Sequence, residues 1–222
     1  MHVVVNAATS VDGKLSTRRR DQVAISGPED FDRVDALRAE SDAVMVGVGT
    51  VLADDPSLTV DEADRRQDRE DRGDPPNPAR VVADSRVRTP VDATVLDDRA
   101  ETILLVSTEA PPGFVSAMED EGATVIRAGE DRVDLAAALD ALEEHGVERL
   151  MVEGGGTLIF SLFEAGLVDE LSVFVSSQVI GGREAPTLVD GTGFVEDFPQ
   201  LALTDVERVD DGVVLAYDVR DG

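Results

Sequence analysis

The stretch AVMVGVGTVLADDPSLTV, at residues 43–60, decides the fold more than any other part of the chain. It begins with a continuous apolar run, which is typical of a strand covered on both faces. Two glycines, a hydroxyl and two adjacent carboxylates follow: Gly47, Gly49, Thr50, Asp54 and Asp55. The glycines are places where the backbone can come close to a ligand. Taken alone, the stretch fits a ligand-binding strand end and a simple turn with a solvated acidic pair equally well.

As a whole, residues 43–60 resemble the NADPH-dependent diaminopyrimidine reductases of riboflavin biosynthesis, which are freestanding proteins in archaea and the C-terminal half of a deaminase-reductase in bacteria. That family carries G-x-G-T-V-L-x-D-D-P-x-L-T-V after a buried strand, and the chain matches this string from Gly47 to Val60. Three further segments match family motifs in the right order: NAATSVDGKL at residues 6–15, PARVVADSRVRTP at 78–90 and RLMVEGGGTL at 149–158. Each motif alone is weakly specific, but four in order, in a chain of family size, strongly indicate this family.

The composition points to a protein adapted to high salt. The chain has 222 residues, of which 47 are acidic and 20 basic, its formal net charge is -27, and Lys14 is its only lysine. Such a charge destabilises an ordinary domain by self-repulsion, but near ~1 M salt the screening length falls to about 3 Å. Because the acids are spread through every segment, we interpret them as an adaptation to the salt-rich cytoplasm of an extreme halophile. No basic face is visible, so nucleic-acid binding is disfavoured.

Missing residue types disfavour several classes of enzyme. The sequence has no cysteine and only two histidines, His2 and His145. It therefore cannot build the zinc site of the bacterial deaminase half, nor does it fit a Ser-His-Asp hydrolase or a histidine-ligated metal enzyme. We expect no metal site. The chain opens as a strand without a signal peptide, and no apolar run approaches the length of a membrane span, so we expect a cytoplasmic protein that does not bind membranes.

Hydrophobic patterning predicts a single α/β domain over residues 1–222. Apolar runs predict strands at residues 2–8, 43–46, 80–83, 102–106, 124–126, 150–152 and 171–175. Helical patterns fall at residues 114–121, 135–145 and about 157–165, and SGPE at residues 26–29 has the form of a capping box that opens a further helix. Residues 201–209 and 213–219 predict a hairpin across Asp211-Gly212.

Residues 61–74 interrupt this pattern with seven acids and four arginines, so we predict a charged, mobile surface loop at about 61–77. The alternation elsewhere predicts a mostly parallel mixed central sheet with flanking helices and a C-terminal antiparallel hairpin. The resemblance implies the dihydrofolate-reductase-like fold, which suits this order.

The segment EGGGT at residues 153–157 joins a predicted buried strand to a helix. Free backbone N–H groups and the positive end of the helix dipole then point at the turn, and glycines let a pyrophosphate approach the main chain. The segment lies late in the chain and lacks the third glycine of a Rossmann motif. A plain strand-to-helix turn is the alternative, and the resemblance assigns the segment to the phosphates of NADPH.

The resemblance implies a set of residues that bind NADPH: Ser10, Ser26, Thr50, Asp54, Ser85, Arg86, Gly154, Gly155, Gly156 and Thr157. Arginine is the natural partner of a ribose 2′-phosphate, so Arg86 and Arg88 are our candidates for the preference for NADP over NAD. A solvated basic turn would explain them as well, and helix capping would explain Ser26. Asp55 either belongs to the binding site or only caps the following turn.

The resemblance also implies residues that bind the substrate: Lys14, Arg38, Leu58 and Glu153. Glu153 is the candidate catalytic residue, although a glutamate at a strand end is often just solvated. A lone lysine in such a chain suits a phosphate contact, or survives by chance. Relatives from bacteria follow L-T-V with an arginine that contacts the substrate phosphate, whereas this chain has Asp61. The phosphate then needs another partner, such as Arg65 or Arg66.

The activity that the resemblance implies is NADPH-dependent reduction of the ribosylamino side chain of a diaminopyrimidinone 5′-phosphate to the ribitylamino form, by a homodimer. Two alternatives stay open. The chain could be another NADPH reductase of the same fold, acting on a pterin-like or carbonyl substrate. It could also be a non-catalytic NADP-binding module.

Overall fold

A computed structural model of the chain describes residues 1–21 and 23–220, and it divides them into two compact units. The first unit contains Met1 and Asp35–Met151, and the second contains His2–Val34 and Val152–Gly222. Two elements pass from one unit to the other, α1 (Pro28–Glu40) and β6 (Arg149–Gly154). The single domain expected over residues 1–222 stays a prediction, and each unit is described by itself below.

The first unit is built on a parallel sheet whose strand order is β5-β4-β3-β2, with the first half of β6 next to β2. The strands are β2 (Ala43–Gly47), β3 (Ala79–Ala83), β4 (Thr102–Val106) and β5 (Thr124–Arg127). Every residue of β4 is buried, as are the first four of β2. This burial on both faces explains the continuous apolar runs in the sequence. All four strands were predicted, with bounds shifted by at most one residue.

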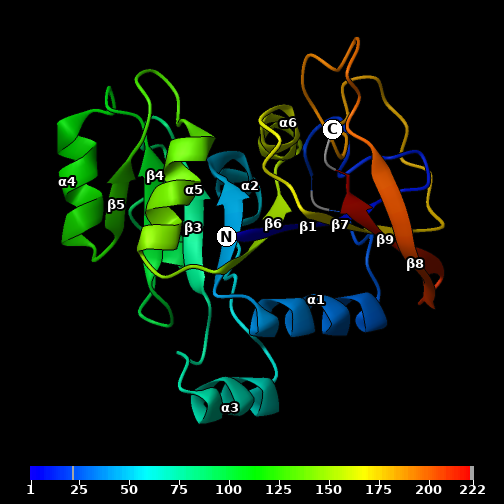
Figure 1. Cartoon of the computed structure of the whole chain (residues 1–222), viewed down its shortest axis with the longest axis horizontal. Coiled ribbons are helices and arrows are strands. Elements are labelled where there is room, and N and C mark those ends of the chain that lie inside the picture. The colour runs from blue at the N-terminus through cyan, green and yellow to red at the C-terminus, as the bar shows by residue number, and fades with distance from the viewer. Residues whose placement is uncertain (22, 221–222) are drawn as a thin grey trace. The chain divides into compact units, whose positions relative to one another are not determined.

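Helices flank this sheet. They are α2 (Val48–Asp54), α4 (Pro112–Asp120) and α5 (Leu135–Glu144), together with a short 3₁₀ helix, η1 (Thr94–Leu96). Both α4 and α5 pack against β5, as Figure 1 shows. Asp134 caps α5 by accepting a hydrogen bond from the N–H of Ala137 at 3.1 Å. The core of the unit consists of aliphatic residues that are fully buried: Val44, Met45, Val46, Val81, Val82, Ile103, Leu104 and Leu105.

The charged segment is a helix rather than the mobile loop that we predicted. Helix α3 (Ala63–Arg72) occupies most of residues 61–74 and ends at Gly73, whose φ of 93° suits a left-handed cap. The buried side chain of Arg69 holds it, because its guanidinium donates to the carbonyl oxygens of Ala39, Ser41 and Pro75. The prediction failed because composition reports low hydrophobicity, whereas one arginine satisfies three backbone carbonyls that lie elsewhere in the chain.

The second unit contains β1 (His2–Thr9), β7 (Glu170–Val175), β8 (Leu201–Val209) and β9 (Gly212–Val219), in the order β1-β7-β9-β8, with the last half of β6 beside β1. Strands β1 and β7 are parallel, whereas β7–β9 and β8–β9 are antiparallel. The hairpin is therefore confirmed, with one bulge between Leu203 and Asp205. Figure 1 shows β8 in orange and β9 in red at the C-terminal end of the colour scale. The unit also contains α6 (Gly156–Glu164) and the first half of α1.

The start of α1 is capped from a distant part of the chain. The carboxylate of Asp210, in the hairpin turn, accepts from the N–H of Asp30 at 3.0 Å and of Glu29 at 3.3 Å, and Glu29 accepts in return from the N–H of Asp210. A Cβ on Gly27 would lie 2.4 Å from Asp210 Cγ, so glycine is needed there. The capping box predicted at Ser26 is thus replaced by a reciprocal pair, Glu29 and Asp210, which are 181 residues apart in sequence.

Candidate functional site

In the first unit, the carboxyl ends of the parallel strands lie at one edge of the sheet. The register pairs Gly47 with Ala83, Ala83 with Leu105 and Val106 with Arg127. The segments that follow these strands therefore meet at this edge, which is where open α/β sheets bind their ligands. Four of our predicted cofactor residues follow β2 or β3 here: Thr50, Asp54, Ser85 and Arg86.

Helix α2 begins directly after β2, where the sequence had suggested only a glycine turn. Gly47 is its N-cap residue, and no side chain caps its first N–H groups. Gly49 is exposed in the first turn, and a Cβ there would meet nothing within 4 Å. The hydroxyl of Thr50 makes no hydrogen bond within the described part of the chain. The turn thus offers free space beside a hydroxyl, which fits a ribose or phosphate group.

Asp54 and Asp55 have different environments although they are adjacent. Asp55 has a φ of 42° and its carboxylate accepts from both the N–H and the hydroxyl of Thr94, each at 2.7 Å. Asp54 forms no hydrogen bond or ion pair among the described residues; the residue is exposed at the surface, and partial desolvation of its carboxyl raises the pKa. A carboxylate that is partly desolvated without a partner is typical of a ligand-binding position. Asp55 therefore supports the turn, and Asp54 is the one left for a ligand.

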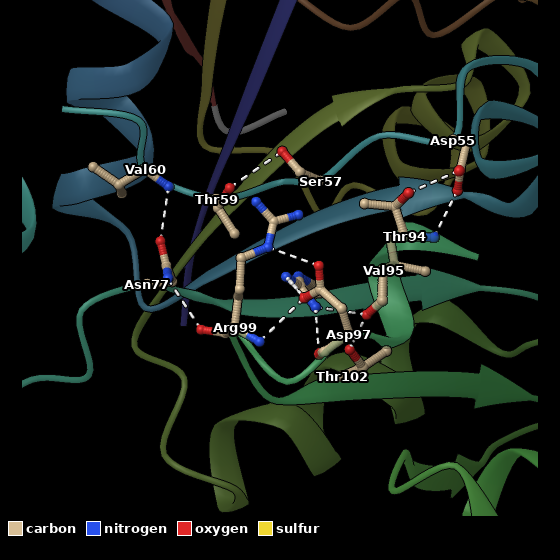
Figure 2. Close-up of polar contacts among 11 residues, drawn as sticks. Asp55, Ser57, Thr59, Val60, Asn77, Thr94, Val95, Asp97, Arg99 and Thr102 are labelled. Carbon is tan, nitrogen blue, oxygen red and sulfur yellow. Dashed lines mark hydrogen bonds and ion pairs between the residues drawn. The ribbon is translucent and has the colours of Figure 1, made fainter. Parts of the chain in front are cut away.

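Residues of two sequence motifs hold the turn at residues 94–97, part of which Figure 2 shows. Asp55 binds Thr94 at the start of η1, and the fully buried Arg80 donates to the carbonyl oxygens of Val95 and Asp97 and to the Asp97 carboxylate at 2.6 Å. Burial raises the pKa of the Asp97 carboxyl, but the hydrogen bonds from Arg80 and Arg99 together outweigh this effect and hold that pKa below its usual range. The arginine of P-x-R-V-V is therefore structural in this chain.

The turn after β3 is held by Asp84, whose buried carboxylate accepts from the N–H groups of Arg88 and Thr89. Val87 has a φ of 53°, which is strained for a β-branched residue. The hydroxyl of Ser85 accepts from the N–H of Val133 at 3.1 Å and keeps its own proton for another acceptor. The exposed side chain of Arg86 is paired with Asp131 at 2.9 Å, so a 2′-phosphate would have to displace this carboxylate.

Arg38 and Leu58 are the predicted substrate residues of the first unit, and a hydrogen bond from Arg38 to the neighbour of Leu58 brings them together. Arg38 donates to the carbonyl oxygen of Thr59 at 3.0 Å. Leu58 is 1% exposed and has a φ of 54°, which is costly for a leucine. Such strain persists only where the surroundings enforce it, and it clusters at functional sites. Leu58 thus fits a role in holding the D-D-P-S-L-T segment in place.

In the second unit, the S-x-D-G-K motif forms a closed turn. Asp12 accepts from the hydroxyl of Ser10 at 2.7 Å and from the N–H groups of Ile180 and Gly181. These bonds, led by the one from Ser10, lower the pKa of Asp12 to about 2. The buried hydroxyl of Ser10 also accepts from the N–H of Lys14. Ser10, which we had predicted as a cofactor contact, uses its hydroxyl within the turn.

The glycine segment and Lys14 meet on either side of residues 185–190. A Cβ on Gly156 would lie 2.2 Å from the carbonyl oxygen of Thr187, and the N–H of Asp190 donates to the oxygen of Gly156. Lys14 pairs with Thr187 as an isolated β-bridge, and its ammonium group donates to the carbonyl oxygen of Ala185 at 3.1 Å. Gly154 ends β6, next to Glu153, and Thr157 is exposed in the first turn of α6.

Two glycines of this segment are required by the fold, each for a different reason. Gly155 is the N-cap residue of α6 and has a φ of 91°, while Gly156 has no room for a Cβ. Either glycine would therefore be required by the fold alone, and their presence does not by itself indicate a phosphate. Thr157 is the more informative residue, because its hydroxyl has no partner within the described residues.

Ser26, another predicted cofactor contact, belongs to a polar network. Its hydroxyl donates to Asp30, which is fully buried and paired with Arg33 at 2.8 Å. Arg33 also donates to Asn6 and Ser172. The sequence analysis missed this network and residues 185–190, because Ser172 lies 139 positions from Arg33 and Ala185 lies 171 positions from Lys14, and no local pattern marks such contacts.

Within the described residues, no group of three or more His, Asp or Glu side chains could hold a metal ion. Over the same residues, none of the helices combines the length and the apolar character that crossing a membrane requires.

Comparisons with known proteins give this arrangement a family. Residues 1–215 match the family model described as the RibD C-terminal domain. The chain is 49% identical to the 2,5-diamino-6-ribosylamino-4(3H)-pyrimidinone 5′-phosphate reductase of Archaeoglobus fulgidus, over 95% of this chain and 94% of that protein. It is 45% identical to the protein of the same name from Methanothermobacter thermautotrophicus, over 99% of this chain and 98% of that protein.

A solved structure extends the likeness to the fold. A pyrimidine reductase-like protein from Corynebacterium diphtheriae superimposes with a TM-score of 0.88, covering 100% of this chain and 92% of that one, at 19% identity. The mostly parallel mixed sheet with flanking helices and a C-terminal hairpin is thus the reductase fold that the motifs implied. With a family model matched over residues 1–215, and archaeal reductases nearly half identical over almost its whole length, this chain belongs to the RibD C-terminal domain family.

Proposed function

We propose that this protein reduces the ribosylamino side chain of a 2,5-diaminopyrimidinone 5′-phosphate to the ribitylamino form, with NADPH as the reductant, in riboflavin biosynthesis. The observation that carries the proposal is the identity of 49% and 45% to the two archaeal reductases over nearly the whole chain. The proposal also draws on Asp54, the last residue of α2, whose carboxylate has no partner among the described residues.

The residues at the strand edge of the first unit fit a dinucleotide. The first turn of α2 leaves open space at Gly49, and Thr50 and Asp54 provide a hydroxyl and an acceptor for ribose or carboxamide groups. Ser85 can donate to a phosphate oxygen, and Arg86 with Arg88 can bind a 2′-phosphate. When bound, NADPH supplies the hydride.

The protein's own part in the reaction is to position and to enclose the substrate. The sugar ring of the substrate has to open to an imine before its C1′ can accept hydride. We assign Glu153 to the substrate side and to the protonation of the sugar oxygen or nitrogen during this opening. Lys14, Arg38 and Leu58 are assigned to substrate binding. Holding the reacting groups in one geometry and excluding water then provides most of the acceleration.

Turnover by the purified protein tests the proposal. In molar KCl, the wild-type protein is expected to oxidise NADPH only when the ribosylamino pyrimidine phosphate is present. Glu153→Gln is expected to keep its affinity for NADPH while kcat/KM for the pyrimidine falls by roughly 10- to 100-fold, as removal of about 1–3 kcal/mol of interaction predicts. Turnover of a pterin or another carbonyl compound instead would favour the alternative reductase. Binding of NADPH without any turnover would favour a non-catalytic module.

We further propose that the protein is a homodimer that joins through one face of its hairpin. The register places one set of hairpin side chains on the face opposite to α1: Leu201, Leu203, Val206, Arg208, Val213, Leu215, Tyr217 and Val219, which we term the outer hairpin face. All three acids of the hairpin strands, Asp205, Glu207 and Asp218, are on the other face. A two-fold contact brings identical faces together, so in a chain of net charge -27 an acid-free apolar face suits a second copy.

Val206→Asp tests this surface, because it places a carboxylate at the centre of the outer hairpin face. The dimer dissociation constant should rise by at least ~100-fold, the effect of about 2.7 kcal/mol. Light scattering would show the change as a fall from twice the chain mass of 23.6 kDa to that mass. Val91→Asp is the matched control, since Val91 and Val206 are both 54% exposed. A wild-type monomer, or a Val206→Asp dimer, would refute the assignment.

A further inference from the structure

In the first unit, Arg38 is the cation assigned to the substrate, and the two arginines that could replace the one missing at position 61 are both engaged. Asp61 stands where bacterial relatives have an arginine, and its N–H donates to the carboxylate of Asp35. Arg65, one of the two arginines that could have replaced it, is paired with Asp35 at 2.8 Å. Arg66, the other, donates to the carbonyl oxygens of Val60 and Asp61. Both guanidinium groups are therefore already engaged in holding the start of α3.

The second unit has unengaged cations. Arg18, Arg19 and Arg20 are consecutive and exposed, and their side chains make no hydrogen bond or ion pair with any described residue. Many other arginines of the chain are tied to acids or to carbonyl oxygens, among them Arg33, Arg72, Arg80 and Arg99. Three adjacent cations without acidic partners are unusual in a chain that has more than two acids for each base.

Residues 180–186 lie beside residues 12–18 and bring a further cation next to Arg18. Leu15 N–H donates to the oxygen of Pro186, and a Cβ on Gly182 would lie 3.7 Å from Arg18 Cβ. Arg183, which follows Gly182, is also exposed and unpaired within the described residues. Asp12 fastens the two segments together through the N–H groups of Ile180 and Gly181. The bond from Ser10, with those from Ile180 and Gly181, lowers the pKa of Asp12 to about 2, so this carboxylate is charged at neutral pH.

The backbone of both segments has an enforced conformation. Arg20 has a φ of 62°, and Gly181 and Gly182 have φ values of 69° and 91°. A left-handed arginine is uncommon, and such strain is kept where the surroundings require it. Lys14 lies at the other end of this cluster, and its neighbour Thr187 contacts the glycine segment at Gly156. The cluster thus adjoins residues that we assign to substrate and cofactor.

We propose that Arg18 and Arg19, with Arg183 and Lys14, bind the phosphate monoester of the substrate. The inference rests on the proposed function for the identity of the substrate. Guanidinium groups form charge-assisted, two-pronged hydrogen bonds to phosphate. The strong negative charge of the chain repels a phosphate from much of its surface, so a cluster of cations without acidic partners is a place where a dianion can approach.

The double variant Arg18→Ser/Arg19→Ser tests this site, and it leaves the strained Arg20 in place. The KM for the phosphorylated pyrimidine should rise at least ~10-fold, the effect of about 1.4 kcal/mol, with kcat within about twofold. The preference for the phosphorylated over the dephosphorylated pyrimidine should fall by the same factor. Arg132→Ser/Arg220→Ser is the control, because it removes two other exposed arginines without ion pairs in the described chain.

Two further measurements separate the possible results. An unchanged preference for the phosphorylated substrate in the double variant overturns the proposal. A rise in the NADPH dissociation constant without a change in that preference also overturns it, because the cluster then binds a cofactor phosphate. Calorimetry with ribose 5-phosphate, compared with ribose, tests the site without turnover. Loss of ribose 5-phosphate binding in the double variant would therefore support the site even if the proposed reaction failed.

Discussion

At low ionic strength this protein is expected to unfold. Its net charge is -27, and acids stand side by side on its surface, as at Glu119, Asp120 and Glu121, which are all exposed. At ~0.1 M salt the screening length is about 10 Å, so neighbouring carboxylates repel one another, whereas at ~1 M it is about 3 Å. A loss of about 5 kcal/mol would lower the melting temperature by roughly 10–20 °C in a chain of this size.

Circular dichroism across a KCl series measures this effect directly. We expect a folded protein at ~2 M KCl and a melting temperature that falls steeply below ~1 M, where the repulsion is no longer screened. Sucrose at the same osmolality serves as the control, because it favours compact states without screening charge. Equal melting temperatures at ~0.1 M and ~2 M KCl would contradict our interpretation of the composition as an adaptation to salt.

Asp54→Asn should weaken NADPH binding by roughly 10- to 100-fold, since a hydrogen bond to a charged group contributes about 1.5–3 kcal/mol. The folded protein should lose no stability. Burial raises the pKa of Asp54, so the charged carboxylate is disfavoured in the folded state, and its cost to stability is present above that pKa and relieved as the pH falls. An uncharged amide removes this cost. Fluorescence titration with NADPH and thermal melting measure the two effects.

Asp55→Asn is the matched control, and it should show the reverse pattern. An asparagine tolerates the φ of 42° but keeps only one acceptor for the two bonds from Thr94. We expect a loss of about 1 kcal/mol of stability, seen as a fall of roughly 2–4 °C in melting temperature, with NADPH affinity nearly unchanged. If Asp54→Asn bound NADPH as tightly as the wild type, the carboxylate of Asp54 would have no part in the cofactor site.

The family and the strand pattern could be read from the sequence. Continuous apolar runs such as residues 43–46 identify strands buried on both faces, because a parallel sheet excludes water from each side. The hairpin across Asp211-Gly212 follows from local turn chemistry. Both signals arise between residues close together in the chain, so the sequence contains them.

The sequence could not tell Asp54 from Asp55, or a binding hydroxyl from a structural one. Asp55 is a cap because Thr94 lies beside it, and Ser26 is occupied because Asp30 accepts its proton. Helix α3 forms because Arg69 finds carbonyl oxygens at Ala39 and Ser41. Each outcome depends on a hydrogen-bond partner that only folding brings within reach. The residue types were therefore determined by the sequence, whereas their roles were decided by the tertiary structure, because a polar group is free for a ligand only when no neighbour satisfies it.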